Sequence, residues 1–298
     1  MTKQKKKFVV IGMSDAKYGD FLINHWLRSL KENIDENLVD IAVLDYGMTE
    51  KQVKKLLEKS VKLEKSNKDG HVVNIRYRDM LKFLEKNPYE QIMTCDSGDL
   101  IFQDDITHLF HKHKDKYRGV CEGLAPPAIE YTLVQKPFPK EIEEEIEKTL
   151  INKKMVNGGL VIAPYEKFIE LCKTMNKLIK NKHIFGPDQV VLNYTLYKEG
   201  FKNLDKKYNY TITTHGKFKI KKGIFYDHKK NIIPIVHNSG NFSFFRPIKN
   251  FGYGENYNKL KLFPYLSLRA AYSLNFIVNP VLRFFRKKNL TLKKSFTQ

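Results

Sequence analysis

Cysteine is scarce in this 298-residue chain. The three cysteines are widely spaced and odd in number, and no two form a Cys-x-x-Cys pair, so a disulfide scaffold is excluded and a structural zinc site is disfavoured. Long apolar runs are also missing, because the longest candidate, 270–282, falls short of the ~20 residues that span a bilayer. The apolar run at 8–13 is too short for a signal-peptide core. We therefore expect a cytoplasmic protein with free thiols.

Acidic residues are the second shortage. Lys and Arg number 53 and Asp and Glu 33, which gives a formal net charge of +20. This balance predicts an anionic partner: nucleic acid, an anionic membrane surface or a phosphorylated substrate. Hydrophobic residues make up 42% of the chain, so disorder throughout is excluded.

Short β-branched runs alternate with helical periodicity in the first hundred residues. We predict strands at 8–13, 39–44, 72–75 and 91–95, with helices at 21–32, 49–65 and 78–86. This alternation is typical of an α/β fold with a mostly parallel sheet flanked by helices. Further along we expect a proline-bearing loop at 126–140, an acidic helix after it, strands at 160–163 and 232–236, and helices at 165–180 and 186–197.

A carboxylate-rich turn, Asp96-Ser-Gly-Asp99, follows the predicted strand at 91–95. Open α/β sheets bind ligands at the carboxyl ends of their strands. Carboxylate oxygens suit Mg²⁺ or Mn²⁺, which bridge to substrate phosphates, although a solvated Asx turn also fits the residues. Further polar groups at predicted element ends favour a site, namely Asn157-Gly-Gly, Asp188-Gln189 and His237-Asn-Ser-Gly240.

Together these motifs resemble the GT-A (Rossmann-like) fold glycosyltransferases, most closely the family 8-like group that uses nucleotide sugars. The resemblance covers residues 8–247 and depends on the order of the motifs, which starts with Ser14-Asp-Ala-Lys-Tyr18. It implies that Asp96 and Asp99 bind a divalent metal, Mn²⁺ or Mg²⁺, and the donor diphosphate. His237 is then the third metal ligand.

The resemblance also assigns residues to the nucleotide-sugar donor. Asp15 and Tyr18 match the region that holds the base, Arg78 lies where a basic residue reaches the donor, and Asn157 is expected near the donor sugar or acceptor. Plainer roles remain open from the residues alone. Asp15 is also a possible helix N-cap, Tyr18 a packing aromatic and Asn157 part of a turn.

Asp188 and Gln189 match the family's pair near the anomeric carbon, and we expect them to be the catalytic residues. Asp188 is also a possible helix cap, and His237 a core histidine. Two features depart from the family pattern: the carboxylates are spaced DxxD rather than DxD, and no lysine follows the HxxG motif. Arg246 stands where it would take over the diphosphate contact of that lysine.

The composition changes from residue 256 onward. The stretch 256–298 holds nine Lys or Arg and no acidic residue, interleaved with aromatic and aliphatic side chains. Its prolines, Pro264 and Pro280, predict two short amphipathic helices, which we expect to lie in an anionic membrane interface. A helix docked on the catalytic domain and a nucleic-acid tail are the alternatives. We therefore divide the chain into a catalytic domain, 1–255, and a C-terminal segment, 256–298.

The expected function is metal-dependent transfer of a hexose from a nucleotide diphosphate sugar. The donor expected first is a UDP-sugar, the acceptor is a hydroxyl of a cell-surface glycan or lipid-linked precursor, and the place is the inner face of the cytoplasmic membrane. Retention of anomeric configuration is implied by the resemblance, but the residues also permit inversion. A sugar nucleotidyltransferase is disfavoured because Gly12-Met-Ser-Asp-Ala-Lys is not a glycine-rich basic loop. A non-enzymatic protein that binds nucleic acid or membranes leaves the carboxylate turn unexplained, and we expect no nucleic-acid partner.

Overall fold

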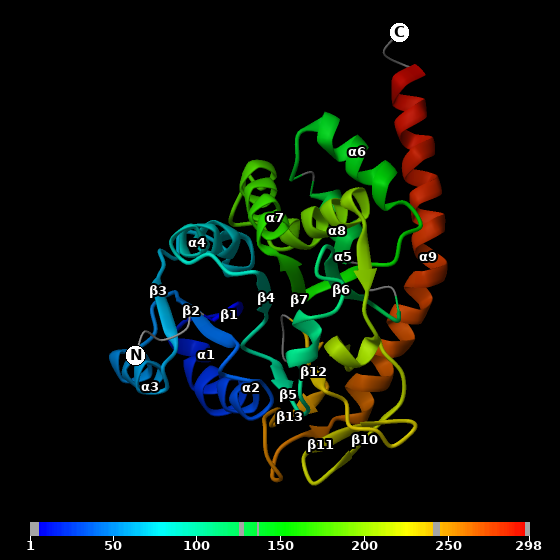
Figure 1. The fold of residues 1–298 in the computed structure, drawn as a ribbon. Coiled ribbons are helices and arrows are strands. Elements are labelled where there is room, and N and C mark those ends of the chain that lie inside the picture. The colour runs from blue at the N-terminus through cyan, green and yellow to red at the C-terminus, as the bar shows by residue number, and fades with distance from the viewer. Residues whose placement is uncertain (1–5, 125–127, 136, 241–244, 296–298) are drawn as a thin grey trace.

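A computed structural model of the chain describes residues 6–124, 128–135, 137–240 and 245–295, and it shows an α/β body with a long helix along one side (Figure 1). Side chains are described as far as residue 280, apart from those at 134, 276 and 279. Parts of two predicted segments lie outside the described residues. These parts are 126, 127 and 136 of the proline-bearing loop, and 296–298 of the C-terminal segment.

A seven-stranded sheet forms the centre of the body, in the order β3-β2-β1-β4-β7-β6-β8. Its strands are parallel to their neighbours except β7, which runs antiparallel to both β4 and β6. The predicted α/β fold with a mostly parallel sheet is therefore confirmed. The strands are β1 (Phe8–Ser14), β2 (Val39–Asp45), β3 (Lys62–Lys65), β4 (Gln91–Cys95), β6 (Tyr117–Cys121), β7 (Val156–Pro164) and β8 (Phe201–Asn203).

Helices cover both faces of this sheet (Figure 1). Strand β1 is buried along its whole length, as its continuous apolar run predicts for a strand covered on both faces. Val9 and Ile11 pack into one core cluster and Phe8 and Val10 into another, because successive side chains of a strand alternate between faces. The first cluster includes α4 (Val72–Lys86), α6 (Lys140–Leu150), α7 (Tyr165–Leu178) and α8 (Pro187–Glu199). The second includes α1 (Ala16–Phe21), the π-helical η1 (Leu22–Leu27), α2 (Arg28–Glu32) and α3 (Glu50–Glu58).

A smaller sheet with the order β5-β12-β9 lies beyond the end of β4. Strand β12 is antiparallel to β5 and parallel to β9, and its last residue, His237, pairs with Leu100 on one side and Thr211 on the other. This register brings His237 beside the turn that precedes Leu100. The strands are β5 (Leu100–Phe102), β9 (Tyr210–Thr211) and β12 (Ile235–His237). The other short elements are η2 (Thr107–Phe110), α5 (Ala128–Val134), η3 (Lys206–Asn209), the hairpin β10 (Phe218–Lys221) with β11 (Ile224–Asp227), and the pair β13 (Ile248–Lys249) with β14 (Lys259–Leu260).

Three local predictions are wrong. The expected strand at 72–75 is the first turn of α4, and the third parallel strand is β3, which lies inside the segment predicted as a helix to 65. The β-branched residues at 72, 73 and 75 favour a strand locally, but burial at 75, 76, 79, 80, 83 and 84 follows helical spacing. The expected loop at 126–140 also contains a helix, α5.

The C-terminal segment forms one continuous helix, α9 (Leu262–Ser295), so the prediction of two short helices is wrong. Pro264 lies in the first turn, where a missing N–H costs nothing, and Pro280 is accommodated inside the helix. Leu268 is buried, and the Arg269 guanidinium donates to the Thr213 carbonyl at 3.2 Å, so the first turns pack on the body. Further on, the helix extends past the body (Figure 1). None of the described helices, α9 included, combines the length and the apolar character needed to cross a membrane.

Candidate metal and donor site

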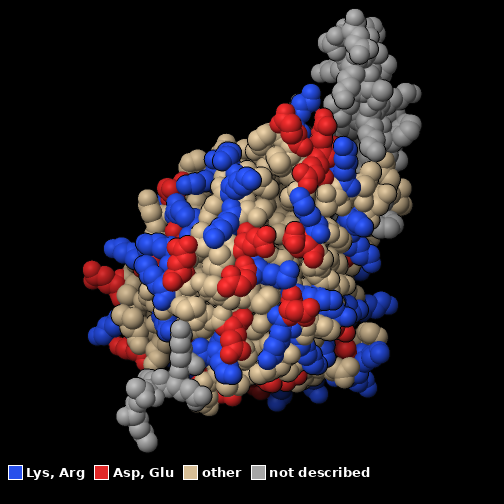
Figure 2. Space-filling model, turned by 45° about the horizontal axis from the view of Figure 1, so that its top comes forward, with Lys and Arg blue, Asp and Glu red and all other residues tan. Residues whose placement is uncertain are grey.

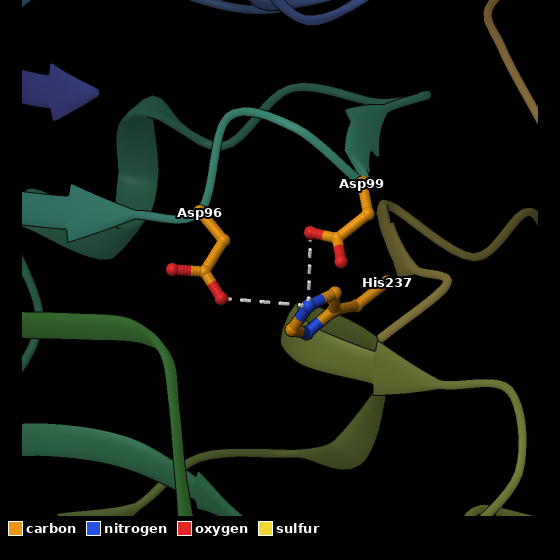
Figure 3. A group of neighbouring side chains, drawn as sticks. All are labelled: Asp96, Asp99 and His237. Atoms are coloured by element: carbon orange, nitrogen blue, oxygen red, sulfur yellow. Dashed lines mark ion pairs between the residues drawn. The ribbon is translucent and has the colours of Figure 1, made fainter. Parts of the chain in front are cut away.

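Asp96, Asp99 and His237 converge where the two sheets meet (Figure 3). Strand β4 ends at Cys95 and β5 begins at Leu100, so both carboxylates stand in the turn that links one sheet to the other. The Nε2 atom of His237 lies 3.7 Å from Asp96 Oδ2 and 3.4 Å from Asp99 Oδ1. In the sequence His237 follows the two carboxylates by 138 or more positions, and the smaller sheet brings it to them.

This cluster fits a divalent cation. Each of the three residues offers one ligand atom, and these atoms lie within 4.8 Å of one another. The His237 Nε2 atom is buried and forms no hydrogen bond with any described residue, although buried polar atoms normally have a partner. Two carboxylate oxygens and one imidazole nitrogen are ligands that suit Mn²⁺ or Mg²⁺.

The turn that carries the carboxylates is tied to its neighbours. The Ser97 hydroxyl accepts a hydrogen bond from the Met13 N–H at 3.0 Å and donates to the Met13 carbonyl, so the turn is fixed to the end of β1. The Asp96 N–H donates to the Gly159 carbonyl on β7 at 2.9 Å. The site is therefore held between three strands of the large sheet.

Charges around the cluster shift its pKa values. Burial by itself raises the pKa of Asp99, but the charges of His237 and Arg246 outweigh burial and hold this pKa below its ordinary value. Burial by itself lowers the pKa of His237, but Asp99 and Asp96 outweigh it and raise this pKa. His237 and Asp99 therefore each favour the charged form of the other.

Arg76 joins the metal cluster to Asp188. Its side chain is 2% exposed, and it contacts Asp96 Oδ1 through Nη1 at 2.8 Å and Asp188 Oδ2 through Nη2 at 3.2 Å. Burial raises the pKa of Asp188 to about 6, although the Arg76 charge opposes this shift. Sequence reasoning missed Arg76, because the supposed strand at 72–75 hid the helical spacing that buries it.

Arg78, by contrast, is not brought to the cluster. Its Nε atom lies 2.8 Å from Asp79 Oδ1 and its Nη1 atom 2.6 Å from Asp69 Oδ1, so neighbouring carboxylates hold its guanidinium. The buried arginine that contacts the cluster is Arg76, two residues earlier on α4. Arg78 and Arg76 therefore have different surroundings on one helix.

Arg246 and Tyr18 lie on the Asp99 side of the site. Arg246 Nη2 lies 2.8 Å from Asp99 Oδ2, and the guanidinium carbon lies 5.9 Å from the centre of the Tyr18 ring. A β-carbon added at Gly98 would lie 3.1 Å from Tyr18 Cδ1, so the ring lies against the metal turn. Arg246 and Tyr18, two of the residues expected from the sequence at the donor, thus lie beside the turn that ends at Asp99.

Asp15 caps helix α1. Its Oδ1 atom accepts hydrogen bonds from the Lys17 N–H at 3.0 Å and the Tyr18 N–H at 3.2 Å, so the N-cap role weighed from the sequence is confirmed. The Lys68 ammonium, 2.7 Å from Oδ2, outweighs burial and lowers the pKa of Asp15. The cap fixes the helix turn that carries Tyr18.

Asn157 and Gln189 form hydrogen bonds with other groups of the protein. Asn157 is buried and hydrogen-bonded to Glu122, Asn209 and the Gly159 N–H. The Gln189 amide accepts from the Gly158 N–H at 3.0 Å and donates to the Val156 carbonyl at 2.5 Å, which anchors it to β7. Gly186, and not Asp188, holds the N-cap position of α8, so Asp188 is not the cap of that helix.

Comparison with known proteins does not assign this chain to a family. No model of a protein family matches the sequence, and a search of the curated proteins found no match.

Proposed function

We propose that this protein is a metal-dependent glycosyltransferase of the GT-A type. It would move a hexose from a nucleotide diphosphate sugar, a UDP-sugar first of all, to a hydroxyl of a cell-surface glycan or lipid-linked acceptor. The observation that carries the proposal is the convergence of Asp96, Asp99 and the His237 Nε2 atom at the end of β4, where Nε2 faces both carboxylates and forms no hydrogen bond with a described residue. A divalent cation held there would neutralise the charge that develops on the leaving diphosphate.

Arg246 and Tyr18 supply the contacts that a nucleotide diphosphate needs on one side of the site. The Arg246 guanidinium offers several N–H donors beside the cluster, and guanidinium groups pair well with phosphate oxygens. The Tyr18 ring lies next to it and is half-buried, which leaves part of its surface for stacking on a base. In this arrangement Tyr18 would stack on the base, Arg246 would contact the diphosphate and Asp99 would hold the metal.

Asp188 is the group we place at the reacting carbon. Its carboxylate is linked to the metal cluster through Arg76, and a pKa of about 6 leaves it ionised at neutral pH. In a retaining reaction it stabilises or attacks the oxocarbenium-like centre, and in an inverting reaction it accepts the proton of the acceptor hydroxyl. Gln189 is anchored at both ends of its amide, which favours Asp188 over Gln189 for either role.

The rival functions account for less of the site. A nucleotidyltransferase loop after β1 would direct N–H groups at a triphosphate, whereas here Asp15 takes the first N–H groups of α1. For a nucleic-acid-binding protein we expect a continuous basic surface. On the face shown in Figure 2, basic and acidic side chains are interspersed instead.

We also propose that helix α9 attaches the enzyme to an anionic membrane surface, the inner face of the cytoplasmic membrane. Its described apolar side chains include Phe263, 78% exposed, and Ile277, 66% exposed, and its sequence is basic. Apolar side chains mixed with lysine and arginine are typical of helices that lie in the membrane interface. A lipid-linked acceptor would be presented at the same surface.

The test is ligand-dependent stability followed by an activity assay. Thermal shifts are measured with UDP-, GDP-, CMP- and ADP-sugars, each with and without Mn²⁺, because a ligand that binds the native state raises its melting temperature. We expect one nucleotide class to stabilise the protein only when Mn²⁺ is present, and EDTA to abolish transfer until Mn²⁺ is restored. The Asp96→Asn/Asp99→Asn double variant is the control and should respond to no donor. Full turnover in EDTA, or wild-type rates in that variant, contradicts the proposal.

A further inference from the structure

We propose that Asn157 and Asn209 are positioning residues that fix the His237 ring, with its proton on Nδ1 and its Nε2 atom facing Asp96 and Asp99. The inference rests on the proposed metal site, because it assigns Asn157 and Asn209 a role in orienting His237, one of the proposed metal ligands. It replaces the expectation that Asn157 contacts the donor sugar or acceptor. A chain of hydrogen bonds that starts at the Gly159 N–H connects Asn157, Asn209 and His237.

The first link fixes the orientation of the Asn157 amide. A backbone N–H only donates, so the side-chain atom that lies 2.8 Å from the Gly159 nitrogen is the Asn157 oxygen. The other end of the amide is then the NH₂ group, which donates to Glu122 Oε1 at 2.5 Å. Glu122 also accepts hydrogen bonds from the hydroxyls of Thr211 and Thr214. Both ends of Asn157 are therefore held by fixed partners.

The second link carries this orientation to Asn209. The Asn157 oxygen only accepts, so the Asn209 atom 3.0 Å from it is the NH₂ group. The Asn209 oxygen is thereby turned toward His237 Nδ1, which lies 3.0 Å away. An amide oxygen accepts and does not donate, so Nδ1 carries a proton. The lone pair of the neutral ring is then on Nε2, the atom that faces both carboxylates.

Packing prevents the ring from escaping this arrangement. Asn209 is fully buried and His237 is 1% exposed, so water does not replace either partner. A β-carbon added at Gly159 would lie only 2.2 Å from His237 Cε1, so the ring rests directly on the backbone of β7. The same glycine thus supplies the N–H that starts the chain and the surface on which the ring lies.

The expected effect is on metal affinity. Groups that hydrogen-bond the second nitrogen of a metal-binding histidine typically contribute a factor of about 10–100 in affinity. Asn209→Leu keeps the branched shape and the number of heavy atoms of the side chain and removes the oxygen that holds Nδ1. Binding of Mn²⁺ alone, followed by the loss of the free-ion EPR signal, should weaken by about 10–100-fold.

Asn74→Leu is the matched control. Asn74 is likewise buried, but its amide donates only to the carbonyls of Lys182 and Ile184, at 3.0 and 2.7 Å. It should lower the melting temperature about as much as Asn209→Leu and leave Mn²⁺ affinity within twofold of wild type. A purely structural role for Asn209 would make the two variants alike.

A spectroscopic measurement keeps the inference testable even if Asn209→Leu fails to fold. Long-range ¹H–¹⁵N spectra of wild-type protein labelled at histidine, assigned with His237→Gln, identify which ring nitrogen is protonated. With Mg²⁺ as a diamagnetic probe, we expect Nδ1 to keep its proton before and after addition, and the Nε2 resonance to shift on addition. A proton on Nε2 with a bare Nδ1 overturns the inference. Mn²⁺ uptake that is equal in wild type and Asn209→Leu overturns the positioning role alone, whereas no uptake by the wild type overturns the proposed metal site.

Discussion

The guanidinium of Arg246 lies 2.8 Å from Oδ2 of Asp99, the carboxylate whose other oxygen faces His237. One carboxylate is thus shared between a cationic side chain and a predicted metal position. A metal cation at that position and the Arg246 guanidinium repel one another. A diphosphate that lies between them would relieve this repulsion, so it would favour binding of the metal. Arg246 therefore links metal binding to donor binding.

We predict that Arg246→Gln changes two affinities in opposite directions. Mn²⁺ alone should bind a few-fold more tightly, because a competing positive charge is removed from Asp99. A nucleoside diphosphate in saturating Mn²⁺ should bind about tenfold more weakly, the loss expected for one hydrogen bond to a charged group. Both affinities are measured by isothermal titration calorimetry.

Arg78→Gln is the control for this pair of measurements. Arg78 is also an arginine paired with carboxylates, but those are Asp69 and Asp79, away from the cluster. It should change neither affinity. Parallel losses of both affinities in Arg246→Gln would instead indicate that Arg246 only supports the fold of the site.

Arg76 should contribute to stability far more than Arg78. Arg76→Met leaves Asp188 buried and without its cation, and breaking a buried ion pair in this way typically costs about 3–5 kcal/mol. Arg78 is about one third exposed, so Arg78→Met should cost only ~1 kcal/mol. Urea denaturation gives the free energies of unfolding of the two variants. Equal values would contradict the assignment of Arg76 as the buried residue that links Asp96 to Asp188.

The pH dependence of turnover should report Asp188. Because burial raises its pKa to about 6, the carboxylate is ionised above pH 6 and takes up a proton below it. If the ionised form acts on the donor or acceptor, the turnover number at saturating Mn²⁺ and donor should fall as the pH drops through about 6. Asp188→Asn should lose most activity at every pH while still binding Mn²⁺. Turnover that stays constant from pH 8 to 5 would rule out this role.

Features encoded in neighbouring residues were predictable from the sequence. Strands β1, β2 and β4 are short, mostly apolar segments, and the turn from Asp96 to Asp99 follows β4 directly, so a local pattern identified both the sheet and the carboxylates. His237 was expected as a metal ligand only through a family resemblance, because nothing near it in the sequence points to a metal. The smaller sheet that brings it to the turn pairs strands more than 130 residues apart.

Features that depend on distant contacts were not predictable. Glu122 and Asn209 are separated by 87 positions and meet only through Asn157, and no spacing rule marks either of them. Arg76 was missed because β-branched neighbours give a strand signal that burial of one helical face overrides. In α9 the prolines indicated two helices, although one of them falls in the first turn.

The last prediction concerns helix α9, whose two parts differ in their contacts. Up to Arg269 the helix packs on the body through Leu268 and the hydrogen bond to Thr213. Beyond it, Leu274 and Ile277 are exposed, and 283–294 contains six basic residues.

A protein ending at Ser273 should therefore keep its melting temperature and its activity on a soluble acceptor. Since each basic residue near an anionic leaflet adds ~1 kcal/mol, its binding to phosphatidylserine vesicles in a co-sedimentation assay should weaken at least about tenfold. A protein ending at Tyr253 is the comparison, and it should also lose stability because Leu268 and strand β14 are removed. Vesicle binding by the shorter helix that equals that of the full chain would show that the exposed end of α9 is not the membrane anchor.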